Sequence, residues 1–196
     1  LVGHVTKDGS LAGPRVLEHL VDVVLQFEAA ENSGLRTLRA LKNRFGSTQE
    51  LGLFEMAERG LLGVDNPSAL FLSAGGAGPV LCSLQGSRPL LCEVQALITP
   101  THFGQPQRAM SGLDPYRLPL LFAVLEKRCG LALYSHDVFV SAAGGLRVTE
   151  PAADLAVALA VSAGLKNQAP AHGLACFGEV GLSGELRPVG QAVARL

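Results

Sequence analysis

Residues 22–56, DVVLQFEAAENSGLRTLRALKNRFGSTQELGLFEM, contain the pattern that decides the fold of the first part of the chain. Three apolar segments, at 22–27, 35–41 and 51–56, are separated by short segments rich in Asn, Ser and Gly. Such separating segments are typical of turns, so we predict three strands with short connections. Strands joined in this way form an antiparallel meander, which commonly finishes an α/β sheet at one edge.

The rest of the chain mixes strands with helices. The string Asp65-Asn66-Pro67-Ser68 marks a change in composition, and we place a domain boundary near residue 66. Beyond it, apolar spacing predicts strands at 79–85, 89–98 and 138–142, a loop at 99–112, helices at 117–129 and 152–165, and short closing strands at 174–180 and 185–188. The predicted class is therefore α/β over 1–66 and α+β over 67–196.

The composition excludes several classes of protein. The 196 residues include 16 Lys+Arg and 17 Asp+Glu, and 48% are hydrophobic, which excludes intrinsic disorder and a globally basic nucleic-acid coat. Any contact with nucleic acid must come from a local basic patch. The longest charge-free stretch, at 66–87, is interrupted by prolines and glycines, so it predicts no membrane helix and no membrane partner.

The cysteines indicate a reducing compartment. Cys82, Cys92, Cys129 and Cys176 are far apart, form no C-x-x-C pair and stand among apolar neighbours. This pattern favours buried thiols over a zinc or redox site, so we predict no metal site. Because no signal peptide is recognisable, we expect a soluble, cytoplasmic protein.

The string Lys42-Asn43-Arg44-Phe45-Gly46 carries the most distinctive chemistry. Two cations spaced two residues apart at a strand end can project together toward an anion, and Gly46 frees the backbone for a turn. The residues alone also fit a solvated basic turn.

Together with Gly3-His4-Val5-Thr6-Lys7-Asp8-Gly9 and Ala12-Gly13-Pro14, this string resembles the bacterial RadA (Sms) family of DNA repair proteins. The resemblance extends along almost the whole chain. It implies the last strands of a RecA-like ATPase core over 1–66, followed by a Lon protease-like domain over 67–196. The first residue is not Met and the last residues look like the opening of a helix, so we expect a piece of a longer protein, truncated within its last domain.

The resemblance also implies roles for particular residues. Lys42 and Arg44 match family cations that reach the nucleotide of a neighbouring subunit, and Lys7 lies in a loop that faces DNA. ATP and Mg²⁺ are the implied cofactors of the full-length protein, and zinc belongs only to an N-terminal finger. The sequence contains neither that finger nor a G-x-x-x-x-G-K-[ST] string, so we expect no cofactor and no ATPase activity in this chain alone.

Peptidase activity is the main alternative, and two positions argue against it. Lon-type peptidases use a Ser nucleophile at a helix start and a Lys base further on. The matching positions here are Ala152 and Val193, which offer neither a nucleophile nor a base. We therefore expect no proteolysis.

A local basic patch could bind DNA in the second part of the chain. Its members are Arg108, Arg117, Lys127 and Arg128. Lys127 and Arg128 are also favoured by the dipole at the end of the predicted helix, so a solvated face remains an alternative.

The sequence thus predicts part of a DNA-dependent ATPase in homologous recombination and branch migration. This chain would be its platform for ring assembly, as a homo-hexamer, and for sequence-independent binding of single-stranded or branched DNA. A purely structural oligomerisation domain is the other alternative.

Overall fold

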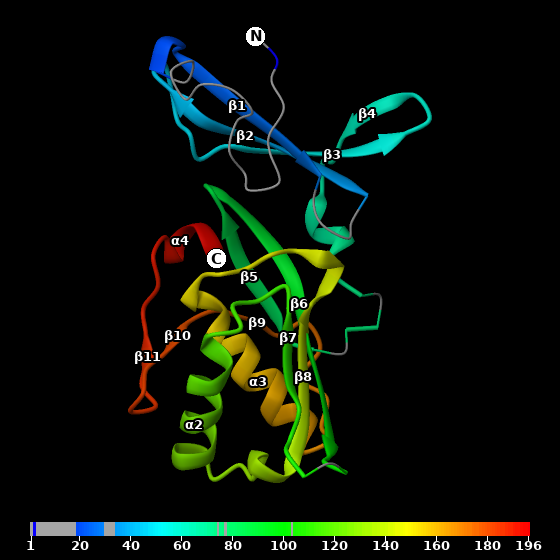
Figure 1. Cartoon of the computed structure of the whole chain (residues 1–196), viewed down its shortest axis with the longest axis vertical. Helices are drawn as coiled ribbons and strands as arrows, with labels where there is room; N and C mark the ends of the chain where they lie inside the picture. The colour runs from blue at the N-terminus through cyan, green and yellow to red at the C-terminus, as the bar shows by residue number, and fades with distance from the viewer. Residues whose placement is uncertain (1, 3–18, 30–33, 74, 77, 103) are drawn as a thin grey trace.

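The structure, a computed structural model, describes residues 2, 19–29, 34–73, 75–76, 78–102 and 104–196. Its first sheet contains β1 (Val23–Ala29), β2 (Leu35–Asn43), β3 (Leu51–Ala57) and β4 (Gly60–Gly63), in that order and all antiparallel (Figure 1). The predicted meander is confirmed. The fourth strand was not predicted, because a four-residue segment after a two-residue turn is too short to show an alternating pattern.

Alternation of side chains gives this sheet two different faces. Phe27 pairs with Leu38, Arg36 pairs with Phe54, and the Phe27 and Phe54 rings lie 6.5 Å apart on one face. Leu35 and Leu53 point the other way and are buried in the hydrophobic core. The sheet is therefore attached to the rest of the molecule through one face.

The second sheet has five strands in the order β7-β8-β6-β5-β9. They are β5 (Val80–Gln85), β6 (Arg88–Pro100), β7 (Arg108–Ser111), β8 (His136–Ala142) and β9 (Ala175–Cys176). Pairs β5–β6 and β6–β8 are antiparallel, whereas β7–β8 and β5–β9 are parallel. The prediction of a loop over 99–112 is wrong at both ends: β6 continues to Pro100, and Arg108–Ser111 forms β7 because it pairs with β8, a contact that local sequence does not encode.

Two helices pack along one side of this sheet (Figure 1). Helix α2 (Arg117–Cys129) buries its apolar stripe and ends at Gly130, which takes a left-handed conformation with φ 67°. Helix α3 (Asp154–Leu165) follows a 3₁₀ turn, η4 (Pro151–Ala153). Its small residues allow close packing: a Cβ on Gly164 would lie 3.3 Å from Ile98 of β6. Both predicted helices are confirmed.

The chain closes with two small elements. Strands β10 (Glu179–Val180) and β11 (Leu186–Arg187) pair as an antiparallel hairpin. Helix α4 (Ala192–Arg195) follows. Three short 3₁₀ turns, η1 (Pro67–Leu70), η2 (Leu133–Ser135) and η3 (Ala143–Gly145), complete the described elements. This architecture is mixed α/β, as predicted.

The two sheets touch at the β5–β6 turn. The Ser87 N–H donates to the Gln49 carbonyl at 2.9 Å, and Arg88 Nη2 donates to the Asp65 carbonyl at 3.2 Å. Gly86 has φ +66°, and a Cβ there would lie 1.9 Å from the Gln49 oxygen, so this approach requires glycine. The expected domain boundary near residue 66 lies between the first sheet and β5, and it stays a prediction.

Candidate functional sites

The turn at Lys42–Gly46 is built by the side chain of Asn43. Asn43 Oδ1 accepts a hydrogen bond from the Phe45 N–H at 3.0 Å, and its Nδ2 donates to the Ser47 carbonyl at 3.2 Å. A short amide that bonds the backbone on both sides organises a turn without other packing. The turn therefore has a defined shape although it is exposed to solvent.

Both cations of this turn reach the segment that leads into β1. Arg44 Nη1 contacts Asp22 Oδ1 at 3.0 Å, and the Arg44 N–H donates to the Asp22 carbonyl at 3.1 Å. Lys42 Nζ donates to the His19 carbonyl at 3.5 Å. The structure therefore brings Lys42 and Arg44 to the same end of the first sheet, with the Arg44 side chain 62% exposed.

Ala152 and Val193, at the positions that correspond to the nucleophile and base of a peptidase, lie in very different surroundings. Ala152 is buried in the turn before α3, and its carbonyl accepts a hydrogen bond from the Gly178 N–H at 2.9 Å. Val193, on α4, is 88% exposed. Neither side chain has an atom that could attack or accept a proton.

A buried ion pair lies beside Ala152 instead. Arg195 contacts Glu150 through two nitrogens and donates to the Cys82 carbonyl at 2.7 Å, and its guanidinium lies 5.7 Å from the centre of the Phe177 ring. Burial alone would raise the pKa of Glu150, but hydrogen bonds from Arg195 and the Leu84 N–H lower it overall. The pair lines a cavity of about 420 Å³ together with Ala152.

Two of the predicted DNA-binding residues are engaged within the chain. Arg108, on β7, lies 4.7 Å over the Phe122 ring, with Nη2 3.8 Å from Glu126 Oε1. Arg117, at the start of α2, donates through Nε to Asp154 Oδ1 at 3.1 Å and through Nη2 to Oδ2. Asp154 is only 2% exposed, and its hydrogen bond raises the pKa of Arg117.

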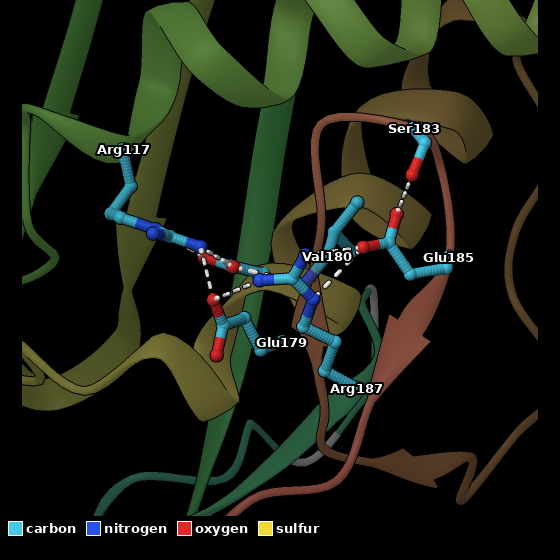
Figure 2. Close-up of polar contacts among 7 residues, drawn as sticks. Arg117, Glu179, Val180, Ser183, Glu185 and Arg187 are labelled. Carbon is cyan, nitrogen blue, oxygen red and sulfur yellow. Dashed lines mark hydrogen bonds and ion pairs between the residues drawn. The ribbon is translucent and has the colours of Figure 1, made fainter.

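A network of ion pairs continues from Arg117 into the β10–β11 hairpin (Figure 2). Glu179 Oε1 lies 3.9 Å from Arg117 Nη2 and 4.0 Å from Arg187 Nη1. Arg187 also binds Glu185, which accepts a hydrogen bond from Ser183 (Figure 2). The hydrogen bond from Ser183 is the main cause that lowers the pKa of Glu185 to about 2. The network fastens the hairpin to the starts of α2 and α3.

The other two predicted DNA-binding residues lie in the last turn of α2. Lys127 and Arg128 take part in no ion pair within the described part of the chain. The stem of Arg128 packs on Gly184 of the hairpin turn, where a Cβ would lie 3.2 Å from Arg128 Cγ. Arg117 and Arg128 line a common cleft of about 570 Å³ between α2 and the hairpin. Lys7 lies outside the described residues.

Comparison with curated proteins identifies relatives along the whole chain. It is 51% identical to the DNA repair protein RadA of Bacillus subtilis, 53% to that of Pseudomonas aeruginosa and 51% to that of Streptococcus pyogenes serotype M3. Each alignment covers 100% of this chain and 44% of the relative. Over its whole length the chain is similar to RadA proteins.

The chain spans less than half of the length of these RadA relatives and matches their C-terminal part. No protein-family model matches it. Among the described residues, no helix is long and apolar enough to cross a membrane, and no group of three or more His, Cys, Asp or Glu side chains could hold a metal ion.

Sequence reasoning missed the carboxylates that hold these arginines in the folded chain. Asp22, Glu150 and Asp154 each contact an arginine at least 22 positions away in the chain. A lone acid at the start of the Ala- and Val-rich segment 152–165 was the one visible signal, because a charge on a buried helix needs a partner. The sequence alone does not identify the residue that pairs with this acid.

Proposed function

We propose that this chain is the C-terminal part of a DNA-dependent ATPase that acts in DNA repair and homologous recombination, by branch migration of recombination intermediates. The observation that carries the proposal is the 51–53% identity over the whole chain to proteins named DNA repair protein RadA. In the full-length protein ATP and Mg²⁺ are the cofactors. The subunits assemble into a homo-hexamer, with residues 67–196 as the platform for assembly and DNA binding.

In this proposal Lys42 and Arg44 act on the ATP bound by a neighbouring subunit. Three properties of the turn support the role. It has a defined shape set by Asn43, it is exposed, and its arginine uses only Nη1 in its ion pair with Asp22. A guanidinium presents five N–H donors in a fork that matches phosphate oxygens, so donors remain for the nucleotide. A cation that stabilises the transferring phosphoryl group in this way is worth about 10³–10⁵ in rate.

The test is ATP hydrolysis by the full-length protein in the presence of single-stranded DNA. Lys42→Ala and Arg44→Ala should each abolish measurable turnover. Arg39→Ala is the matched control: Arg39 is exposed on the same strand and forms no ion pair within the described residues, so its loss should leave turnover unchanged. Wild-type turnover in Arg44→Ala would contradict the role in ATP hydrolysis.

Action on a neighbour, as opposed to the same subunit, needs mixed oligomers. One subunit type carries Arg44→Ala with an intact ATP site, and the other keeps Arg44 but has its ATP site inactivated. Each type alone should be inactive. The mixture should recover turnover, because an intact ATP site then faces an intact Arg44. No recovery, in mixtures shown by sedimentation to co-assemble, would contradict action in trans.

DNA binding by residues 67–196 is supported by the position of Lys127 and Arg128. Their charges are not neutralised by an ion pair in the described structure, and Arg128 lines an open cleft. Phosphate contacts of this kind are independent of sequence. The net charge of −1 means that affinity depends on several copies of the patch around an assembly. A peptidase function is not part of the proposal, since Ala152 and Val193 carry no reactive group.

A further inference from the structure

Asp22 is an acidic residue whose side chain contacts the Lys42–Gly46 turn at Arg44. It immediately precedes β1 and lies opposite the end of β2, because Val23 pairs with Asn43. Its backbone carbonyl accepts from the Arg44 N–H at 3.1 Å, and its Oδ1 contacts Arg44 Nη1 at 3.0 Å. The backbone bond fixes the start of the turn, and the side-chain contact fixes the direction of the guanidinium.

The contact with Asp22 orients the Arg44 guanidinium but uses only one of its nitrogens. The carboxylate engages Nη1 alone, which leaves Nε and Nη2 to bind other oxygens. The pair is exposed on both sides, at 62% for Arg44 and 51% for Asp22, so it contributes little to folding. An unpaired arginine at such a position samples many rotamers, and ordering it at the moment of reaction costs rate.

We propose that Asp22 is the positioning residue for Arg44: it holds the guanidinium pre-oriented toward the phosphates of the ATP in the neighbouring subunit. The inference rests on the proposed role of Arg44. Asp22 itself touches neither ATP nor the reacting atoms. An inhibitory lock would be the opposite role, and it would bind the guanidinium through both carboxylate oxygens, as Glu150 does for Arg195.

The first test compares three variants of the full-length protein. Asp22→Asn removes the charge but keeps the backbone carbonyl that accepts from Arg44, so the turn itself is preserved. We expect kcat for ATP to fall about two- to fivefold, the range set by an exposed ion pair, with KM unchanged. Asp22→Glu should restore most of the rate. Asp65→Asn, at an exposed aspartate outside every ion pair of the described residues, is the control and should match wild type.

The second test uses the mixed oligomers described above, in which turnover depends on Arg44 of one subunit type. Asp22→Asn placed in the subunit that supplies Arg44 should lower the recovered rate by the same factor. Placed in the subunit that carries Arg44→Ala, it should have no effect, because its partner is already absent. A general structural defect would lower the rate from either position.

The outcomes separate the two proposals. If Arg44→Ala abolishes turnover but Asp22→Asn matches Asp65→Asn or turns over faster, Asp22 does not position Arg44 while the role of Arg44 stands. If Arg44→Ala retains wild-type turnover, the proposed role of Arg44 fails and the inference about Asp22 fails with it. Equal loss from both placements of Asp22→Asn also overturns the inference.

Discussion

Two arginine–carboxylate pairs of this molecule have the same chemistry but differ in burial and in how many hydrogen bonds the arginine makes. The side chains of Arg44 and Asp22 are 62% and 51% exposed and share one contact, at 3.0 Å. Arg195 and Glu150 are 3% and 25% exposed, and Arg195 also donates to the Cys82 and Gly190 carbonyls. The first arginine uses one side-chain nitrogen and keeps donors for a partner, whereas all three side-chain nitrogens of the second bond within the fold.

The difference shows how function and stability separate in one chain. A buried charge is costly unless every donor is satisfied, so removing one partner of a buried pair destabilises strongly. An exposed pair is worth little to folding, which leaves its arginine available for another role.

Removing Arg195 should have the largest effect on stability. Arg195→Ala leaves the Glu150 carboxylate without its partner and should lower the free energy of unfolding by about 3–4 kcal/mol. Urea unfolding followed by circular dichroism measures this change. Arg59→Ala is the control, since Arg59 is exposed in the β3–β4 turn and forms no ion pair in the described part of the chain. Equal midpoints for the two variants would contradict the prediction.

The same pair predicts a dependence of stability on pH. The pKa of Glu150 is lowered in the folded protein, so its contribution is complete above the ordinary value of 4.5 and is lost as the pH falls through the lowered pKa. Because Glu150→Gln removes this titration, its unfolding free energy should fall less steeply below pH 4.5 than that of wild type. Parallel acid limbs for the two proteins would show that Glu150 does not contribute.

Removing Arg117 should have an intermediate effect and loosen the hairpin. Arg117→Ala leaves the buried Asp154 with the Val180 N–H as its other partner, at 3.1 Å, and should cost about 2 kcal/mol. Amide hydrogen exchange should increase at Val180 and across the hairpin turn. Arg117→Lys keeps the charge but cannot bind both carboxylate oxygens as arginine does. Its free energy of unfolding should therefore lie between those of wild type and Arg117→Ala. Unchanged exchange at Val180 would mean that the network does not hold the hairpin.

Local elements were predictable where the sequence repeats a local physical pattern. The meander over 22–56, both helices and the strands at 79–85 and 138–142 were confirmed, because each has apolar spacing bounded by turn residues or a helix cap. Strand β7 was missed because Arg108–Ser111 becomes a strand only by pairing with β8. Its four residues contain no alternation that sequence reasoning could recognise.

The candidate sites were predictable in residue type but not in partnership. The Lys42–Gly46 string could be recognised from the sequence, and Lys127 and Arg128 stood out as adjacent cations at a helix end. Their surroundings depend on contacts between distant segments, such as Arg117 with Asp154. For that reason the sequence grouped four cations as one patch, whereas the structure separates two paired arginines from Lys127 and Arg128.

DNA binding should depend more on Lys127 and Arg128 than on the two paired arginines. In the full-length protein, Lys127→Ala/Arg128→Ala should weaken binding uniformly across sequences. Each lost contact should reduce the slope of log K against log salt by about 0.9 on duplex and about 0.7 on single strands, per subunit engaged. Fluorescence anisotropy of labelled DNA at several salt concentrations measures both quantities.

A variant with Arg108, Arg117, Lys127 and Arg128 all replaced by alanine sets the limit of the patch. If it binds DNA as tightly as wild type and with the same slope, the four cations are a solvated face. Arg108→Ala alone tests the grouping, because Arg108 lies over Phe122 and near Glu126. It should change the slope less than Arg128→Ala does.

The smallest effect on stability should come from the exposed pair of Arg44 and Asp22. Arg44→Ala removes one exposed contact and Asp22→Asn removes its negative charge, and each should change the free energy of unfolding by less than about 1 kcal/mol. The dependence of unfolding on urea should keep its slope, because no buried surface changes. The same Arg44→Ala should nevertheless abolish ATP turnover, so a variant of nearly wild-type stability should be inactive. A loss of stability as large as that of Arg195→Ala would show that Arg44, too, is committed to the fold, and the distinction between the two pairs would fail.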